Sequence, residues 1–459
     1  MCCTGSESRI RNSLLLYFSD NCNKKYYNNA GEAKIIYYIL ILLRIYVIKI
    51  ITFFIKITTM INIRRFSMSK SRTVNRMSFW FVAYALLIIM MGTNIPAPLY
   101  SLYGQLWHFS TGVTSFLFIM YVLFLIPASF VFGQLSDRIG RKKVLLAGVI
   151  AAGAGSLMFS VSHNLAMLLA SRAIQGVGVG IINGTAVATL SELRPASSKT
   201  ASLVASVSIA IGTAIGPLYS GLLGEYSSSP IRLPYDLHLV LLGFAFLGLL
   251  AVPETRKIAG APQRLKLPSV PAVIRKPFTI SVLASIIAWA VAVFFMTLVP
   301  TVIATQMNLH NLALSGAVVC LMLGFSTLSQ ILFKSLSASS AIYTGFALLT
   351  LGIVGVVIAI PTQSVFLLLL STVLAGSGHG PAASGSMSWI NEMSPSGSRA
   401  DMMSIFYAVT YLGAGIQVLA LGIGAEWIGF YQAISIYSGL IVVFAAVVAL
   451  IVRGYHATA

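Results

Sequence analysis

The chain has 459 residues, of which 57% are hydrophobic and 9% are charged, and its mean hydropathy is +0.89. A soluble globular protein of this size has nowhere to place so much apolar surface, so the composition indicates an integral membrane protein. The net charge of +19 would suggest nucleic-acid binding in a soluble chain, but here the aromatic residues do not cluster with the bases, and in a membrane protein the cations indicate topology first.

The first 67 residues differ from the rest of the chain. They are rich in Ile, Lys, Tyr and Asn, hold three of the four cysteines and are followed by Met68, which offers an alternative start. Residues 35–60 are apolar, yet three bases interrupt them, and a spanning helix would have to bury these charges or extend them to the interface. Three interpretations stay open: a segment upstream of the native start, an interfacial amphipathic helix, or an additional span. Residues 1–67 therefore carry no weight in the functional interpretation.

Twelve continuously apolar stretches follow, each close to the length of about 20 residues that a helix needs to cross a bilayer. They predict an all-α integral membrane protein with twelve transmembrane helices, because strands of a membrane barrel would alternate in polarity. We place the helices at residues 78–101, 112–135, 143–162, 165–190, 199–223, 236–252, 278–303, 312–335, 339–360, 364–390, 400–424 and 428–452.

Basic residues decide the orientation. Those in the connections between helices fall almost entirely in even-to-odd connections and in the C-terminal tail, whereas the odd-to-even connections hold only Arg232. By the positive-inside rule, both ends of the twelve-helix unit are expected in the cytoplasm, in a bacterial-type inner (plasma) membrane.

The chain divides into two similar halves. Residues 253–277 carry six bases and five prolines and are expected to form a cytoplasmic linker between six-helix halves at 68–252 and 278–459. An internal repeat at an offset of 200 supports parallel halves around a central site. It pairs Gly176, Gly178, Gly180, Glu192, Pro195 and Gly224 with Gly376, Gly378, Gly380, Glu392, Pro395 and Gly424.

One charged turn is highly specific. The run from Gly133 to Lys143 places an acid and four bases between two apolar helices, and as an isolated cluster it fits a solvated surface loop equally well. The order of its residues resembles the loop between the second and third helices of the major facilitator superfamily. That resemblance implies the two-half, twelve-helix major facilitator fold. It also implies a conformational latch, in which Asp137 meets the first turn of the eleventh helix near Ser398 to Asp401. The residues assigned to this latch are Gly133, Asp137, Arg138, Gly140, Arg141 and Asp401.

A membrane-embedded arginine gives a second motif. Arg172, Gln175 and the glycines that follow resemble a motif in the fourth helix of this family. In proton-linked members of the family, the arginine of this motif is associated with proton transfer. Inserting a lone Arg costs about 2.5–3.5 kcal/mol, so it must find carbonyls, water or an anion, or else extend to the outer interface. His379 is the candidate proton site on the tenth helix, because its pKa is ordinarily close to neutral.

The fifth helix carries a packing motif. Gly212, Gly216, Pro217 and Gly221 resemble the motif of the drug and metabolite antiporter branch, although Ser220 replaces an expected Gly. Such small residues let helices approach closely, and plain packing explains the same spacing.

A central substrate cavity is the remaining expectation. The resemblance implies a cavity at mid-membrane that is lined mainly by the first, fourth, fifth, seventh, eighth, tenth and eleventh helices. Polar or aromatic residues in the middle of these helices are the candidates, although aromatics often only pack and amides often cross-link helices. They are Asn94, Asn183, Trp289, Phe295, Gln330, His379, Tyr407, Tyr411 and Gln417. Every carboxylate after residue 67 lies near a helix end or in a loop, which disfavours a strongly cationic substrate.

These features predict a secondary active transporter and not an enzyme, because no catalytic cluster, cofactor motif or metal-ligand set is present. We expect efflux of a neutral or amphipathic compound in exchange for protons. The expected partners are a small-molecule substrate, protons and membrane lipid, with no nucleic acid, and the expected functional unit is a monomer. Uptake of a sugar or other nutrient is the alternative, and a transporter-like sensor is the alternative from another class.

Overall fold

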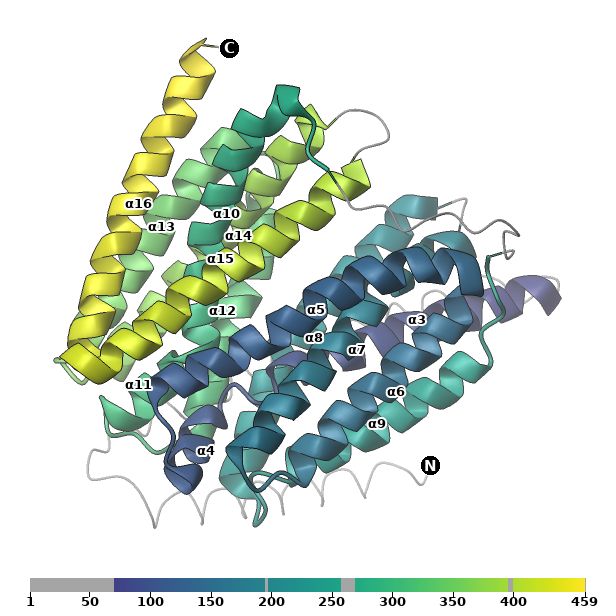
Figure 1. The fold of residues 1–459 in the computed structure, drawn as a ribbon, viewed down its shortest axis with the longest axis horizontal. Coiled ribbons are helices and arrows are strands. Elements are labelled where there is room, and N and C mark those ends of the chain that lie inside the picture. The colour runs from purple at the N-terminus through teal and green to yellow at the C-terminus, as the bar shows by residue number, and fades with distance from the viewer. Residues whose placement is uncertain (1–69, 195–196, 257–268, 395–398, 459) are drawn as a thin grey trace, which may run out of the picture. The chain divides into compact units, whose positions relative to one another are not determined.

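The computed structural model describes residues 70–194, 197–256, 269–394 and 399–458. Within these ranges every regular element is helical, and twelve helices are long and apolar enough to cross a membrane. The predicted all-α architecture with twelve spans is therefore confirmed (Figure 1). Residues 1–67 lie outside the described ranges, so the interpretation of that segment stays a prediction.

The helices follow one another through short connections. The first half contains α3 (Lys70–Asn94), α4 (Tyr100–Trp107), α5 (Thr111–Ile139), α6 (Arg141–Ser160), α7 (Leu165–Leu193), α8 (Ser198–Tyr226) and α9 (Leu233–Leu250). The second half contains a 3-10 turn, η2 (Ala272–Ile274), then α10 (Arg275–Thr297), α11 (Val299–Thr305), α12 (Leu312–Leu332), α13 (Ala338–Ala359), α14 (Val365–Met393), α15 (Arg399–Ile428) and α16 (Phe430–Thr458).

The first and seventh predicted helices are each interrupted, which corrects two of the expected ranges. Instead of one helix over 78–101, α3 ends at Asn94 and α4 begins at Tyr100. Pro96 and Pro98 between them lack the N–H groups that a continuous helix needs. Instead of one helix over 278–303, α10 ends at Thr297 and the short α11 follows after a single residue.

The charged turn is shorter than expected. The second helix was predicted to end at residue 135, but α5 continues to Ile139, so Gly133 and Asp137 are helical. Gly140 alone separates α5 from α6, and its φ of 102° is a backbone angle that residues with a side chain rarely adopt. The fold therefore places Asp137 in the last turn of α5 and Arg141 at the start of α6.

Three glycine pairs of the repeat pack in the same way in both halves. A Cβ on Gly176 or Gly180 would meet backbone atoms of α5, and one on Gly178 would meet the backbone of α6. At an offset of 200, Gly376 and Gly380 face α12, and Gly378 faces α13. The second and third spans of each half thus pack closely against the fourth span.

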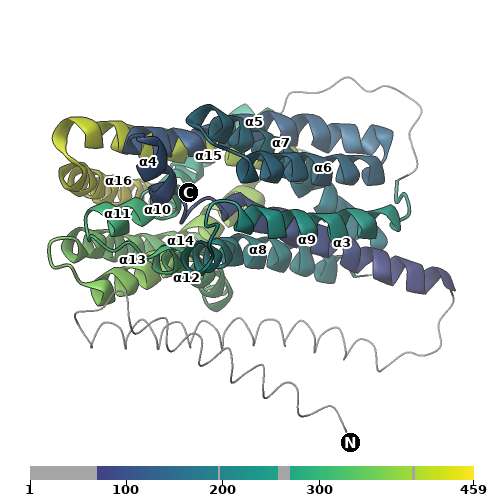
Figure 2. The ribbon, with the colours of Figure 1, turned by 90° about the horizontal axis from the view of Figure 1, so that it is seen from below.

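Two helix pairs join the halves. The pair α8 and α12 and the pair α5 and α15 pack against each other, and both views show α5 and α15 side by side (Figure 2). We call the end of the bundle that carries the α5–α6 turn, Arg194 and Arg256 the basic end. The end where α5 begins and α15 finishes is the opposite end.

Candidate functional site

The break after α3 creates acceptors inside the first half. The carbonyl of Gly92 would bond to the N–H of residue 96 in a continuous helix, but Pro96 has none. Gln175 Nε2, from α7, donates to Gly92 O over 2.6 Å. Arg172 Nη1, one turn earlier on α7, donates to Thr93 O over 2.9 Å. Pro96 thus frees the carbonyl of Gly92, and the end of the helix frees that of Thr93, because Ala97 N donates to Asn94 O instead. The break therefore provides acceptors for two side chains of the predicted proton-coupling motif.

Arg172 is held by neutral groups. It is only 4% exposed, and Nη1 also donates to Gln175 Oε1 over 2.5 Å, while Nη2 donates to the Tyr100 hydroxyl. The rings of Tyr100, Tyr121 and Phe159 lie 5.3, 5.8 and 5.9 Å from the guanidinium carbon, within the range of cation–π attraction. No carboxylate pairs with Arg172 among the residues that the structure describes. The guanidinium thus stays inside the bundle and does not extend to the interface.

A second proline-freed carbonyl involves Asn94. Pro217 in α8 leaves Thr213 O without its helical donor, and Asn94 Nδ2 donates to this oxygen over 3.1 Å. Asn94 therefore cross-links α3 and α8 through its amide nitrogen. This structural role is the alternative to the predicted place of Asn94 in the cavity.

The second half holds an aromatic row beside a buried histidine. His379 on α14 bonds through Nδ1 to Ser326 Oγ over 2.7 Å, and the edge-on ring of Trp289 lies 5.0 Å away. The ring centroids of Trp289 and Tyr411 are 4.9 Å apart, and Tyr411 stacks with Tyr407 at a centroid distance of 5.9 Å. His379 Nε2 has no hydrogen-bond partner within the described ranges. We call His379, Trp289, Tyr411 and Tyr407 the aromatic row.

Tyr121 brings the two halves of the site together. Its ring faces Arg172, and its helix, α5, packs against α15, which carries Tyr407 and Tyr411 of the aromatic row. The predicted residues Arg172, Gln175, His379, Trp289, Tyr407 and Tyr411 therefore belong to one continuous region. Tyr121 was not among the predicted site residues, because an aromatic in an apolar helix gives no signal until its neighbours are known.

Three other predicted cavity residues lie elsewhere in the packing. Phe295 is fully buried with its ring against Phe294. Asn183 and Gln330 are exposed side chains on α7 and α12. No contact places these three in the aromatic row, so their role in a cavity stays a prediction.

An ion-pair network occupies the basic end. Arg141 Nη2 lies 2.6 Å from Asp137 Oδ1 and 3.0 Å from Glu192 Oε1. Arg256 lies 3.3 Å from Asp137. Glu254 accepts hydrogen bonds from the backbone N–H groups of Arg141 and Lys142 over 2.7 and 3.2 Å, and so stabilises the N-terminus of α6. The internal repeat includes Glu192, but the pairing of Glu192 with Arg141 could not be predicted from the repeat, because it depends on how α6 packs against α7.

Among the described residues, Asp137 forms no ion pair or hydrogen bond with the first turn of α15 in this conformation. Its ion-pair partners are Arg141 of the first half and Arg256 of the linker. Asp401 is exposed in the first turn of α15, and Ser398 lies outside the described residues. The latch therefore stays a prediction.

Among the residues that the structure describes, three hydrogen bonds join the halves at the opposite end. Thr111 Oγ1 donates to Gly422 O over 3.0 Å, and Gly112 N donates to Glu426 Oε1 over 3.2 Å. Leu312 N donates to Glu225 Oε2 over 2.8 Å. Both carboxylates thus accept from the first residues of helices in the other half, where unpaired N–H groups favour an anion.

The glycines of the fifth-helix motif face two different neighbours. A Cβ on Gly212 or Gly216 would meet the backbone of α3, within the first half. A Cβ on Gly221 would meet Leu312 O and, at 3.0 Å, the Cα of Gly316 on α12. The motif therefore contributes to the core of the first half and to the contact between the halves.

A second buried histidine was missed. His238 on α9 bonds to Ser156 Oγ over 2.8 Å and to Ile88 O over 2.9 Å, so both ring nitrogens are used. Its place in the middle of an apolar stretch was visible in the sequence, but the sixth helix was not among the expected cavity helices.

Comparisons with known proteins agree with this architecture. A family profile described as Major Facilitator Superfamily matches residues 82–365. The chain is 29% identical to the riboflavin transporter RibZ of Clostridioides difficile (strain 630), over 31% of this chain and 32% of that protein. It is also 29% identical to the multidrug efflux protein YfmO of Bacillus subtilis (strain 168), over 37% of this chain and 42% of that protein. The chain thus spans less than half of the length of these relatives.

Solved structures share the fold. A bacterial homologue of the human lysosomal transporter Spinster, in an inward-facing and unoccupied conformation, aligns with a TM-score of 0.68 at 14% identity, over 84% of this chain and 98% of that chain. A POT family transporter in complex with 5-aminolevulinic acid aligns with a TM-score of 0.67 at 15% identity, over 85% and 97%. The matched proteins are transporters and not enzymes. With a family match that covers more than half of its length, this integral membrane chain belongs to the major facilitator superfamily.

Proposed function

We propose that the protein is a secondary active transporter that exports a neutral or amphipathic small molecule in exchange for protons. The observation that carries this proposal is the position of Tyr121, which lies beside Arg172 on the helix that packs against the helix of Tyr407 and Tyr411. This packing brings a buried cation of one half near the aromatic row and His379 of the other half. Similarity to proteins named for multidrug efflux supports the direction of transport.

Alternating access is supported by the way in which the halves meet. The three hydrogen bonds between them lie at the opposite end, and the positive-inside rule assigns the basic end to the cytoplasm. We infer that this conformation is the one open toward the cytoplasm. On closure of the basic end, Asp137 would exchange Arg141 and Arg256 for the first turn of α15, and this exchange would stabilise the outward-open state.

The chemistry of the region favours a neutral or amphipathic substrate. The aromatic row offers aromatic rings and the free Nε2 of His379, and the two Nη groups of Arg172 donate to neutral acceptors. No carboxylate lies in the middle of a described span, so a permanent cation would have no counter-charge there. Similarity to a protein named as a riboflavin transporter keeps a vitamin-like nutrient as the second candidate.

The free Nε2 of His379 makes it the proposed proton carrier on the second half. Protonation would add a charge next to Trp289, whose ring centroid lies 5.0 Å from that of the imidazole. We propose that this charge, in competition with substrate, couples proton binding to the change between the two open states. The functional unit in this proposal is a monomer in a bacterial-type inner membrane.

Transport by purified protein in proteoliposomes tests the proposal. A panel of neutral, anionic and cationic compounds is assayed with and without an imposed pH gradient. We expect neutral or amphipathic compounds to move, and a pH gradient to accelerate them in the parent protein but not in His379→Gln. The matched control is His238→Gln, because His238 is equally buried but both its nitrogens are bonded. Transport that ignores the pH gradient in the parent protein would overturn proton coupling.

A further inference from the structure

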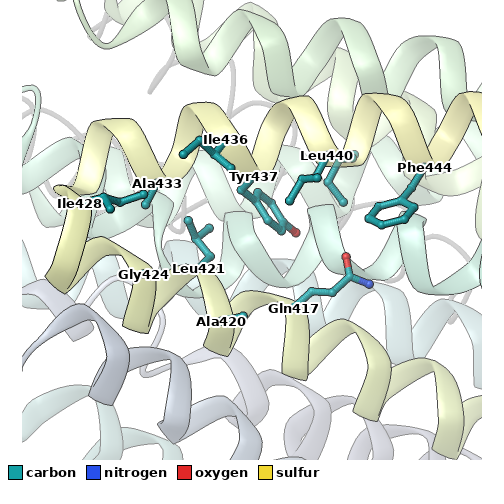
Figure 3. Close-up of a pocket in the computed structure, with 11 residues that line it drawn as sticks. Gln417, Ala420, Leu421, Gly424, Ile428, Ala433, Ile436, Tyr437, Leu440 and Phe444 are labelled. Atoms are coloured by element: carbon teal, nitrogen blue, oxygen red, sulfur yellow. The ribbon is translucent and has the colours of Figure 1, made fainter.

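A pocket of about 230 Å³ lies between α15 and α16, outside the region of Arg172 and the aromatic row (Figure 3). Its walls are mostly aliphatic, with two polar side chains among them. The lining residues are Gln417, Ala420, Leu421, Gly424, Ile428, Ala433, Ile436, Tyr437, Leu440, Ile441 and Phe444.

The two polar side chains are available for a ligand. Tyr437 is only 7% exposed, and its hydroxyl has no hydrogen-bond partner among the residues that the structure describes. The Tyr437 hydroxyl points toward the side of the pocket on which the Gln417 amide extends (Figure 3). A buried hydroxyl without a partner is costly, so an occupant that supplies an acceptor or donor would be favoured.

The pocket opens toward the apolar surface of the bundle. Ile436, Leu440 and Phe444 on its α16 side are 56%, 50% and 51% exposed. Exposed aliphatic and aromatic side chains within a span lie against lipid, so a molecule dissolved in the bilayer has access to the pocket. An acyl chain alone would fill the apolar walls but would leave the Tyr437 hydroxyl unsatisfied.

Depth and charge argue against a phospholipid as the occupant. Tyr437 lies seven residues after the start of α16 at Phe430, which is about 10 Å along the helix axis. The polar groups of a phospholipid lie outside a hydrocarbon core of about 30 Å. The charged residue at the end of α15 next to the start of α16 is the acidic Glu426, and a carboxylate does not complement a phosphate.

We propose that this pocket is a binding site for a neutral small molecule with an apolar body and a single hydroxyl or carbonyl group, which enters from the bilayer. The hydroxyl or carbonyl pairs with Tyr437 and Gln417, and the apolar body packs against Leu421, Ile436 and Leu440. The site is separate from the proposed transport site and does not depend on the transport proposal.

Photolabelling with 3-azioctanol, an eight-carbon alcohol, tests the site in the full chain reconstituted in lipid nanodiscs. Adducts are mapped by mass spectrometry of peptides. We expect labelling of pocket residues on α15 and α16, and protection by excess 1-octanol but not by the hydrocarbon octane. Leu440→Trp fills the pocket and should abolish the labelling. Leu450→Trp is the matched control, because Leu450 is an exposed leucine of α16 outside the pocket, and it should leave the labelling unchanged.

A second variant keeps the test independent of folding. Tyr437→Phe removes only the hydroxyl, and should raise the 1-octanol concentration needed for protection roughly fivefold, the factor of one neutral hydrogen bond. The proposal is overturned if no pocket residue is labelled, if both Trp variants label alike, or if octane protects as well as octanol. Labelling that appears only after removal of co-purified phospholipid would identify a lipid as the occupant and would also overturn it.

Discussion

Gly316 offers the sharpest test of how the halves meet. In this conformation a Cβ at Gly316 would lie 3.0 Å from the carbonyl carbon of Pro217 and 3.1 Å from the Cα of Gly221, and closer still to Pro217 O. These are backbone atoms of α8, in the other half, and they cannot rotate away. Gly316→Ala therefore forces α8 and α12 apart at the opposite end.

The size of the effect follows from overpacking. Extra atoms in a tightly packed contact cost about 1–3 kcal/mol, and the cost falls on the conformation in which α8 and α12 touch. A difference of that size changes the ratio of two conformations by a factor of about 5 to 150. Because the opposite end is closed in this conformation, the variant should favour the state that is open there.

Spin labels at each end measure the shift. One pair, at exposed residues 163 and 362, spans the opposite end, and a second pair, at exposed residues 143 and 340, spans the basic end. In Gly316→Ala the first distance should lengthen and the second should shorten. The control is Gly324→Ala on the same helix, where a Cβ meets nothing within 4 Å, and which gains the same helix propensity. If the two alanine variants gave the same distance distributions, the assigned contact between the halves would be wrong.

Three further outcomes are expected. Arg172→Ala should leave protein that inserts and folds but no longer exchanges substrate for protons; full proton-coupled transport in vesicles would contradict this. Asp137→Asn should shift spin-label distances toward the state open at the basic end, because the latch loses a helix-dipole contact of about 0.3–1 kcal/mol. In the conformation described here, Arg141 keeps Glu192 as its partner. An unchanged distance distribution would refute the latch. A chain that begins at Met68 should insert and transport normally, and loss of transport with intact expression would show that residues 1–67 are functional.

Features that depend on the length and polarity of the chain were predictable from the sequence. The twelve spans follow from continuous apolar runs, and the repeat indicated two similar halves, in which three glycine pairs pack alike. Arg172 and Gln175 were predictable as a buried pair, because a charge inside a span must find polar partners.

The partners themselves depend on packing between distant helices. The break near Asn94 was evident from its prolines, yet nothing in the sequence showed that the freed carbonyls would accept from Arg172 and Gln175, or that Asn94 would bond to Thr213. The end of α5 was placed too early, at residue 135, because the charged residues from Asp137 onward were interpreted as the turn. No helix breaker lies between Gly133 and Gly140, and one glycine in a helix costs only about 1 kcal/mol.

Proton movement driven by substrate tests the central claim most directly. Proteoliposomes with a pH-sensitive dye in the lumen start at equal pH inside and outside, and a compound that the protein transports is then added outside. Exchange of substrate for protons predicts that the lumen becomes more alkaline, at a rate that Arg172→Ala abolishes. An acidified lumen would show co-transport, and an unchanged lumen pH during substrate entry would show transport without protons; either result would contradict the proposed exchange.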